Sequence, residues 1–133
     1  MAAAPWSSLF VHDRPALIGV LHLPPLPGSP RWQGDFEAVR RFALADASAY
    51  LAGGADGLVV ENFGDAPFFA SAVPAHTVAA MARIAAEVVE AASGLPVGIN
   101  VLRNDAQAAM GIAVASGPSF VRVNVLKIGR AHV

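Results

Sequence analysis

Two patterns of hydrophobic residues alternate along the chain from Ala16 onward. Short, nearly continuous apolar runs alternate with longer segments in which apolar residues recur every three or four positions. The first pattern is typical of strands buried on both faces, and the second is typical of helices that cover them. The apolar runs are ALIGVLH, DGLVVEN, PVGINV and SFVRVNV. Four such runs separated by helical segments predict βα units and a parallel sheet.

Capping residues place the ends of three predicted helices. Asp35 is an N-cap candidate for the first helix, which ends at a Gly-Gly pair. Pro74 occupies a first-turn position of the second helix, and Gly94 closes it. Asn104 or Asp105 caps the third helix, which is rich in alanine. The helices therefore lie between consecutive strands, as the βα interpretation requires.

The strands themselves distinguish two architectures, an open doubly wound sheet and half of a (β/α)₈ barrel. A period of two puts Arg122 and Asn124 on one face of the fourth strand and its valines on the other. The third strand likewise has Gly98 and Asn100 opposite its apolar residues. A doubly wound sheet has helices on both faces and seldom tolerates a charged residue in mid-strand. The pattern therefore favours a parallel half-barrel with polar side chains in a central lumen, the first part of a TIM barrel.

Polar residues gather where the predicted strands end. The carboxyl ends of the strands are where (β/α)₈ enzymes build their active sites, because the βα loops all open on that rim. We expect catalytic groups among His22, Glu61 and Asp65. Candidates for ligand binding are Asn62, Asn100, Arg103, Asn104 and Asn124.

The three catalytic candidates leave several roles open. His22 could be a general acid or base, since imidazole titrates near neutral pH, or it could shape the rim through hydrogen bonds. Glu61 and Asp65 with His22 could bind a hard divalent cation, or Glu61 could act as a base while Asp65 orients the loop. Alternatively, Asp65 and Asn62 form an Asx-type turn that satisfies backbone groups.

Two arginines also have alternative roles. Arg103 could clamp a phosphate or carboxylate near the amino end of a helix, or it could form an ion pair with Asp105 or Asp65. Arg122 needs an anionic partner in the lumen, and Glu61 is the candidate, which indicates a structural pair.

Composition and charge narrow the classes of function. Apolar residues make up 55% of the 133 residues, the net charge is −1, and there is no cysteine. The absence of cysteine excludes disulfides and thiolate chemistry, and scattered arginines without a basic patch argue against nucleic-acid binding. No apolar run is long enough to span a membrane and no signal peptide is recognisable, so we expect a cytoplasmic protein. No glycine-rich phosphate loop of the P-loop or dinucleotide type occurs.

The chain divides into three parts on this interpretation. Residues 1–15 are an N-terminal extension, and residues 16–126 are four βα units of a truncated barrel. Residues 127–133 end in IGRAHV, which a common sequencing adapter encodes in one reading frame, so we interpret this segment as adapter read-through. Without it the chain has no lysine, which argues against a Schiff-base aldolase.

Five ordered blocks resemble the amino-terminal half of the BtpA/SgcQ family. They are IGVLHLPPLPGSPRW, GGADGLVVENFGDAPF, VPAHTVAAMARI, LPVGINVLRNDAQAAMGIA and FVRVNV. The resemblance implies a (β/α)₈ barrel of the ribulose-phosphate-binding type. It also implies a link either to photosystem I biogenesis or to sugar metabolism.

Three hypotheses about function follow. The intact protein binds, and could transform, a small anionic sugar-related ligand by acid–base chemistry. Alternatively, it is a non-catalytic photosystem I assembly factor that acts at the membrane surface through peripheral association. Thirdly, the fragment has no function of its own, and its open edge strands lead to homo-oligomers.

Overall fold

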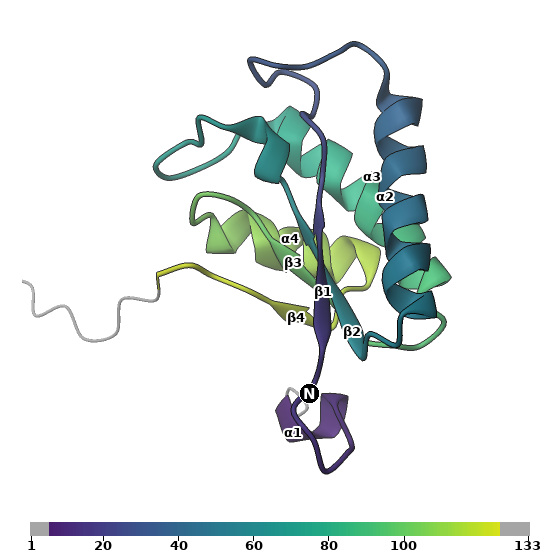
Figure 1. The fold of residues 1–133 in the computed structure, drawn as a ribbon. Helices are drawn as coiled ribbons and strands as arrows, with labels where there is room; N and C mark the ends of the chain where they lie inside the picture. The colour runs from purple at the N-terminus through teal and green to yellow at the C-terminus, as the bar shows by residue number, and fades with distance from the viewer. Residues whose placement is uncertain (1–5, 126–133) are drawn as a thin grey trace, which may run out of the picture.

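The fold is a four-stranded parallel sheet with a helix after each of the first three strands (Figure 1). The computed structural model describes residues 6–125. Its elements, in chain order, are α1 (Trp6–Leu9), β1 (Ile18–His22), α2 (Phe36–Ala52), β2 (Gly57–Glu61), the 3-10 helix η1 (Phe63–Asp65), α3 (Ala75–Ala91), β3 (Val97–Asn100), α4 (Ala106–Ser116) and β4 (Phe120–Val121). The predicted βα alternation is confirmed. Residues 127–133, for which adapter read-through is predicted, lie outside the described residues.

The strands follow the order β1-β2-β3-β4, and all three pairings are parallel. The register sets His22 opposite Glu61 on the neighbouring strand, and Glu61 opposite Asn100 on the next. Three of the candidate polar residues are therefore adjacent at the carboxyl edge of the sheet. Because β1 and β4 form the two edges, the expectation of homo-oligomers through these strands stays a prediction.

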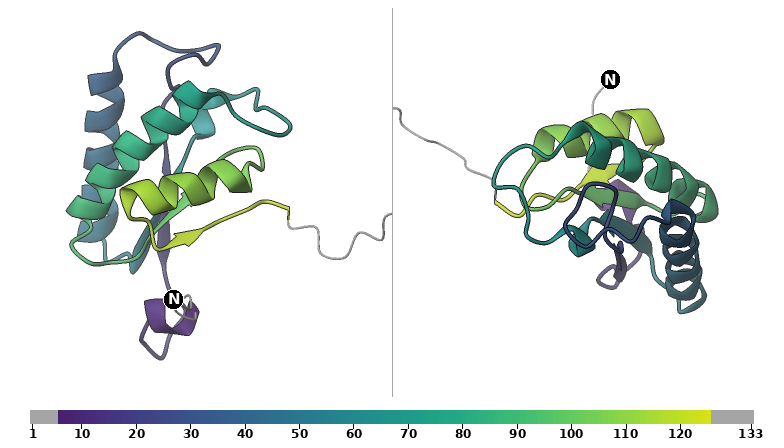
Figure 2. Two further views of the ribbon diagram at one scale, coloured as in Figure 1. Left: turned by 180° about the vertical axis from the view of Figure 1, so that it is seen from behind. Right: turned by 90° about the horizontal axis from the view of Figure 1, so that it is seen from above.

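One face of the curved sheet carries α2, α3 and α4 (Figure 2). The core lies between the sheet and these helices, where Leu58 and Val60 of β2 and Met81 and Ile84 of α3 are fully buried. The opposite face borders a groove of about 580 Å³, to which Val20, Arg122 and other residues contribute. Helices on one face and a lumen on the other confirm the predicted half-barrel.

Capping follows the sequence closely, with two differences. Asp35 accepts a hydrogen bond from the Ala38 backbone N at the start of α2, and Asp105 does the same for α4. Pro74 is the N-cap of α3 and so precedes the first helical turn. The helix also ends before the predicted Gly94, because a positive φ of 49° at Ser93 already turns the chain out of the helix.

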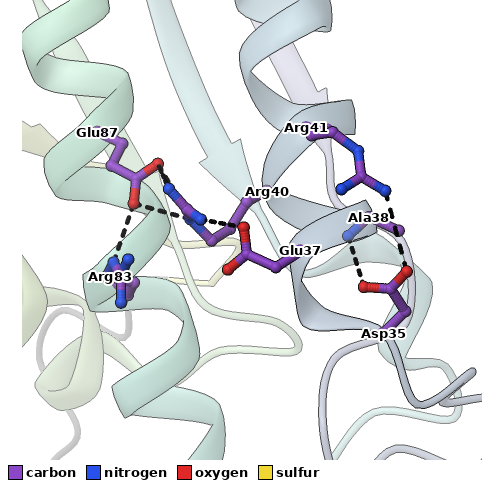
Figure 3. A network of polar contacts seen from close by, with 7 residues as sticks. All are labelled: Asp35, Glu37, Ala38, Arg40, Arg41, Arg83 and Glu87. Carbon is purple, nitrogen blue, oxygen red and sulfur yellow. Dashed lines mark hydrogen bonds and ion pairs between the residues drawn. The ribbon is translucent and has the colours of Figure 1, made fainter.

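An ion-pair network joins α2 to α3 on the outer surface (Figure 3). Arg40 of α2 donates to Glu87 of α3 from Nε at 2.8 Å and from Nη2 at 2.7 Å, and it also pairs with Glu37. Arg83, one turn before Glu87, donates to the same carboxylate at 2.9 Å. Hydrogen bonds from Arg40 lower the pKa of Glu87. The network therefore links the two helices through charged side chains on their outer side.

The N-terminal segment covers the opposite end of the sheet from the predicted site. Trp6 of α1 packs against Phe10 and Phe120, with ring centroids 5.1 Å apart in both pairs. Arg14 donates two hydrogen bonds of 2.7 Å to Asp56, whose carboxylate also accepts from the backbone N of Leu17 at 2.7 Å. The Arg14 hydrogen bonds lower the pKa of Asp56 to about 2. This end of the sheet is therefore closed by aromatic packing and a paired carboxylate.

Candidate functional site

Glu61 is the centre of the polar cluster at the carboxyl edge of the sheet. It is the last residue of β2, and only 5% of it is exposed. Its carboxylate accepts 2.6 and 3.2 Å hydrogen bonds from Asn100 Nδ2 and Arg122 Nη1. His22 Nε2 lies 3.4 Å from Oε1. Residues from all four strands or their ends therefore meet at one carboxylate, and the predicted Glu61–Arg122 pair is confirmed.

His22 lies on the solvent-exposed side of this cluster. Its side chain is 54% exposed, and its ring lies against that of Phe63 with centroids 4.5 Å apart. The loop that follows is tied to β2, since Leu23 N donates to the Glu61 carbonyl at 2.9 Å and Gly64 N donates to the Leu23 carbonyl at 2.9 Å. The imidazole is therefore both positioned by its neighbours and open to solvent or a ligand.

Asn100 and Asn124 extend the cluster toward β4. Asn100 Nδ2 lies 3.4 Å from Asn124 Oδ1, and Asn124 Nδ2 donates to the Arg103 carbonyl at 2.9 Å. The Asn100 Oδ1 atom is buried and has no hydrogen-bond partner within residues 6–125. A buried acceptor without a donor is costly, so this atom marks a position where a donor is needed.

The other two candidates in the β3–α4 loop differ from each other. Asn104 exchanges two hydrogen bonds with the backbone of Val125, at 3.0 and 2.9 Å, so its amide holds the segment after β4 in place. The Arg103 side chain is exposed and makes no ion pair with Asp105 or Asp65 among the described residues. Its guanidinium group is therefore free to meet a ligand.

Asp65 does not join His22 and Glu61. Its Oδ1 accepts from the Leu26 backbone N at 2.8 Å, and its Oδ2 lies 3.3 Å from Asn62 Nδ2. The 3-10 turn of η1 redirects the chain after the strand, so the carboxyl group faces the proline-rich loop. Burial raises the pKa of Asp65. Asp65 therefore does not share a site with the other two groups, and within residues 6–125 no group of three His, Cys, Asp or Glu could hold a metal ion. A catalytic role for Asp65 stays a prediction.

Asn62 satisfies backbone groups, as the alternative interpretation predicted, but it does so across two loops and not in the predicted Asx-type turn. Its Oδ1 accepts a 2.6 Å hydrogen bond from the Leu102 backbone N, and its Nδ2 lies 3.3 Å from the Leu102 carbonyl. It is 1% exposed and connects the loops after β2 and β3. His76 was not among the candidates, although the structure places it near Asp65. The sequence signal was a histidine at the start of a helix, which alone is weak.

The arrangement of the sheet and its rim defines the class of protein. A parallel sheet with helices outside, a lumen inside and polar groups at the carboxyl rim is part of a (β/α)₈ barrel. The chain matches the BtpA family over residues 13–132, and it belongs to that family. The fold is therefore the first portion of a TIM barrel.

Several relatives support this assignment. An uncharacterized protein of Pyrococcus furiosus is 53% identical over 83% of this chain and 41% of its own length. The photosystem I biogenesis protein BtpA of Synechocystis sp. is 51% identical over 83% of this chain and 38% of its own length. An uncharacterized mitochondrial protein of Caenorhabditis elegans is 28% identical over 87% of this chain and 43% of its own length. The chain thus spans about two fifths of the length of these relatives.

No solved structure matches the chain. Within residues 6–125, no helix has the length and apolar character needed to cross a membrane.

Proposed function

We propose that the carboxyl-terminal rim binds a small anionic, sugar-related ligand and transforms it by acid–base chemistry at His22 and Glu61. One observation is the main support: Glu61 is buried in contact with polar groups from three other strand ends, beside an Asn100 oxygen that lacks a donor. A ligand hydroxyl at that position would supply the missing hydrogen bond. The rest of the relatives' length would complete the barrel around it.

The charges around the rim support an anionic ligand. The guanidinium of Arg122 contacts Glu61 through one nitrogen and is 53% exposed, so its other nitrogens can still donate. Arg103 adds a second cation without an ion-pair partner in the described part of the chain. Arginine binds phosphate and carboxylate groups in bidentate fashion, so either side chain suits an anionic ligand. Asn124 contacts the Arg103 carbonyl and the Asn100 side chain, and its amide can also meet ligand hydroxyl groups.

The reaction follows from the positions of the two titratable groups. Glu61 is shielded from solvent and can take a proton from a bound ligand, whereas His22 is open to water. Since their nearest atoms lie 3.4 Å apart, a proton taken by one group can pass to the other and then to solvent. Asn100 and Arg122 hold the Glu61 carboxylate in position for that transfer.

A ligand titration of the full-length protein that contains this segment tests the proposal. Thermal shift would be measured with ribose 5-phosphate and with uncharged ribose, for the parent and for Glu61→Gln and His22→Ala. We expect stabilisation by the phosphate ester that is weaker in both variants, and no such change in a Glu90→Gln control on the exposed face of α3. An equal response of parent and variants would remove these residues from the site.

A second candidate function rests on the 51% identity to the Synechocystis protein. In this case the chain acts as a non-catalytic biogenesis factor, associates with the membrane surface and does not use the rim chemistry. Identity to the Pyrococcus protein is as high, so sequence similarity does not favour either function. Expression of the full-length protein in Synechocystis lacking BtpA distinguishes them. Restoration of photosystem I by both the parent and Glu61→Gln supports the non-catalytic role, and loss of restoration in Glu61→Gln supports rim chemistry.

A further inference from the structure

A second cavity lies behind the rim, on the opposite side of the end of β2. It has a volume of about 340 Å³, and neither His22 nor Glu61 lines it. Its walls come from the loops after β1, β2 and β3 together with the start of α3. All the residues that line it therefore belong to the described part of the chain.

Most of the cavity wall is apolar. Pro67, Phe68, Phe69, Val73 and Leu102 contribute ring and aliphatic surface from two different loops. Small-molecule sites typically have such walls with a few polar groups that fix orientation. The shape and chemistry suit a compact ring.

The polar groups of the cavity converge on one carboxyl group. Asp65 lines the cavity and is 9% exposed, and Asn62 lies beside it. The Oδ1 of Asp65 accepts a hydrogen bond from the Leu26 backbone N at 2.8 Å, whereas Oδ2 makes the longer 3.3 Å contact with Asn62 Nδ2. Oδ2 can therefore accept a stronger hydrogen bond from a ligand. The buried Ser29 hydroxyl lies on the same wall, close enough to Asp65 to lower the pKa of that carboxyl group.

His76 forms the mouth of the cavity, where its ring lies against the backbone of Gly28. A Cβ on Gly28 would come within 2.2 Å of His76 Nε2, and Gly28 has a φ of +86°. Glycine is therefore required for the loop and the helix to approach this closely. Burial raises the pKa of Asp65, and His76 is near enough that a charge on its ring would act in the opposite direction.

We propose that this cavity is a second ligand site, for a compact ring-bearing molecule whose neutral or cationic hydrogen-bond donor, a hydroxyl or primary amine, meets Asp65. Among the described residues no arginine or lysine lines the cavity, so, unlike the rim, it does not favour an anionic group. Two adjacent residues at the end of β2 belong to different sites. Glu61 contributes to the rim, and Asn62 contributes to the cavity. The proposal does not depend on the function proposed for the rim.

Benzylamine and benzoate are matched probes, because they share a ring and differ in the sign of their charge. Backbone amide NMR of the full-length protein would be recorded with each probe at equal ionic strength. We expect benzylamine to shift the amides of Leu26, Gly28 and Thr77, and benzoate to leave them in place. Equal binding of the two probes, or no shift at these amides with either, would overturn the proposal.

Two variants test the site by different routes. Asp65→Asn keeps an acceptor for the Leu26 amide but removes the charge, and should weaken benzylamine binding at least tenfold. Val73→Phe fills the cavity and should abolish binding, while Val114→Phe at an exposed position and Asp46→Asn on α2 serve as controls. Wild-type affinity in both cavity variants would refute the site. The ribose 5-phosphate response should survive Val73→Phe, so failure here is separable from failure of the rim proposal.

Discussion

Two carboxylates stand at opposite ends of β2, and their surroundings differ. Asp56 precedes the strand and is held by two hydrogen bonds from Arg14 and one from the backbone of Leu17. Glu61 ends the strand, is more deeply buried, and shares its partners with an exposed imidazole and a half-exposed guanidinium. The first carboxylate has a complete set of local partners.

The comparison shows how one sheet separates stability from chemistry. At the amino end, charge pairing and aromatic rings close the structure. At the carboxyl end, the Asn100 oxygen lacks a donor and Arg103 lacks an ion-pair partner in the described residues. We therefore expect the carboxylate at the amino end to matter for conformational stability and the carboxylate at the rim to matter for binding, in agreement with the general organisation of (β/α)₈ barrels.

Gly64→Ala, in the loop that follows β2 at the rim, should reduce the unfolding free energy more than any carboxylate-to-amide substitution. A Cβ at this position would lie 2.5 Å from the Pro25 backbone N and 2.6 Å from the Leu23 carbonyl oxygen. Because backbone atoms cannot move aside easily, we expect a loss of about 3 kcal/mol in unfolding free energy. Urea denaturation followed by circular dichroism measures it. Gly111→Ala in α4 is the control, with open space around it and an expected gain of about 0.5–1 kcal/mol.

Replacing each carboxylate by its amide tests the difference between the two ends of β2. Asp56→Asn should lower the thermal midpoint and leave the response to ribose 5-phosphate unchanged. Glu61→Gln should lower affinity for the same ligand about tenfold, or 1.4 kcal/mol. The thermal midpoint of Glu61→Gln should fall less than that of Asp56→Asn, because the half-exposed Arg122 that loses its partner is solvated. The comparison fails if Asp56→Asn impairs binding or if Glu61→Gln is the more destabilising of the two.

A pH series tests the paired carboxylate at the amino end. The pKa of Asp56 is about 2, below its ordinary value of 3.8. A lowered carboxyl pKa means that the stabilisation is present above the ordinary value and is lost as the pH falls through about 2. The stability difference between the parent and Asp56→Asn should therefore be constant from pH 7 to about 4 and shrink below that. Chemical denaturation at each pH measures it, and a difference that persists unchanged at pH 2 would contradict the assignment.

Asp65→Asn should have the smallest effect on stability. Burial raises the pKa of Asp65, so the folded state disfavours the ionised carboxyl group. Its contribution is fully present below the ordinary pKa and is lost as the pH rises through the raised value. At pH 7 the asparagine variant should therefore be no less stable than the parent and within about 1 kcal/mol of it. Any advantage should vanish near pH 3, and a clear loss of stability at pH 7 would show that the ionised form is needed for folding.

The features that were predictable from the sequence are those governed by periodicity. Alternation along β3 and β4 placed Asn100 and Arg122 in the lumen, and charge balance then identified Glu61 as the partner of Arg122. Parallel strand ends must share one edge, so the rim cluster followed from the strand boundaries.

The position of Asp65 and the second cavity were not predictable in the same way. Asp65 follows the strand by four residues, and the 3-10 turn between them has no hydrophobic period that reveals its direction. The cavity joins His76 to Gly28, which are 48 positions apart and meet only because of how two loops fold. Local sequence patterns give no information about such long-range contacts.

The placement of Glu61 and Asn62 on two sides of one strand end has a consequence for the evolution of this family. Removing or inserting a single residue within β2 would rotate every later side chain of the strand to the other face. The carboxylate would then point toward the cavity and the amide toward the lumen, and both sites would be lost at once. We therefore expect the length of this strand to tolerate no change in any homologue that retains either site, even where the flanking loops vary freely.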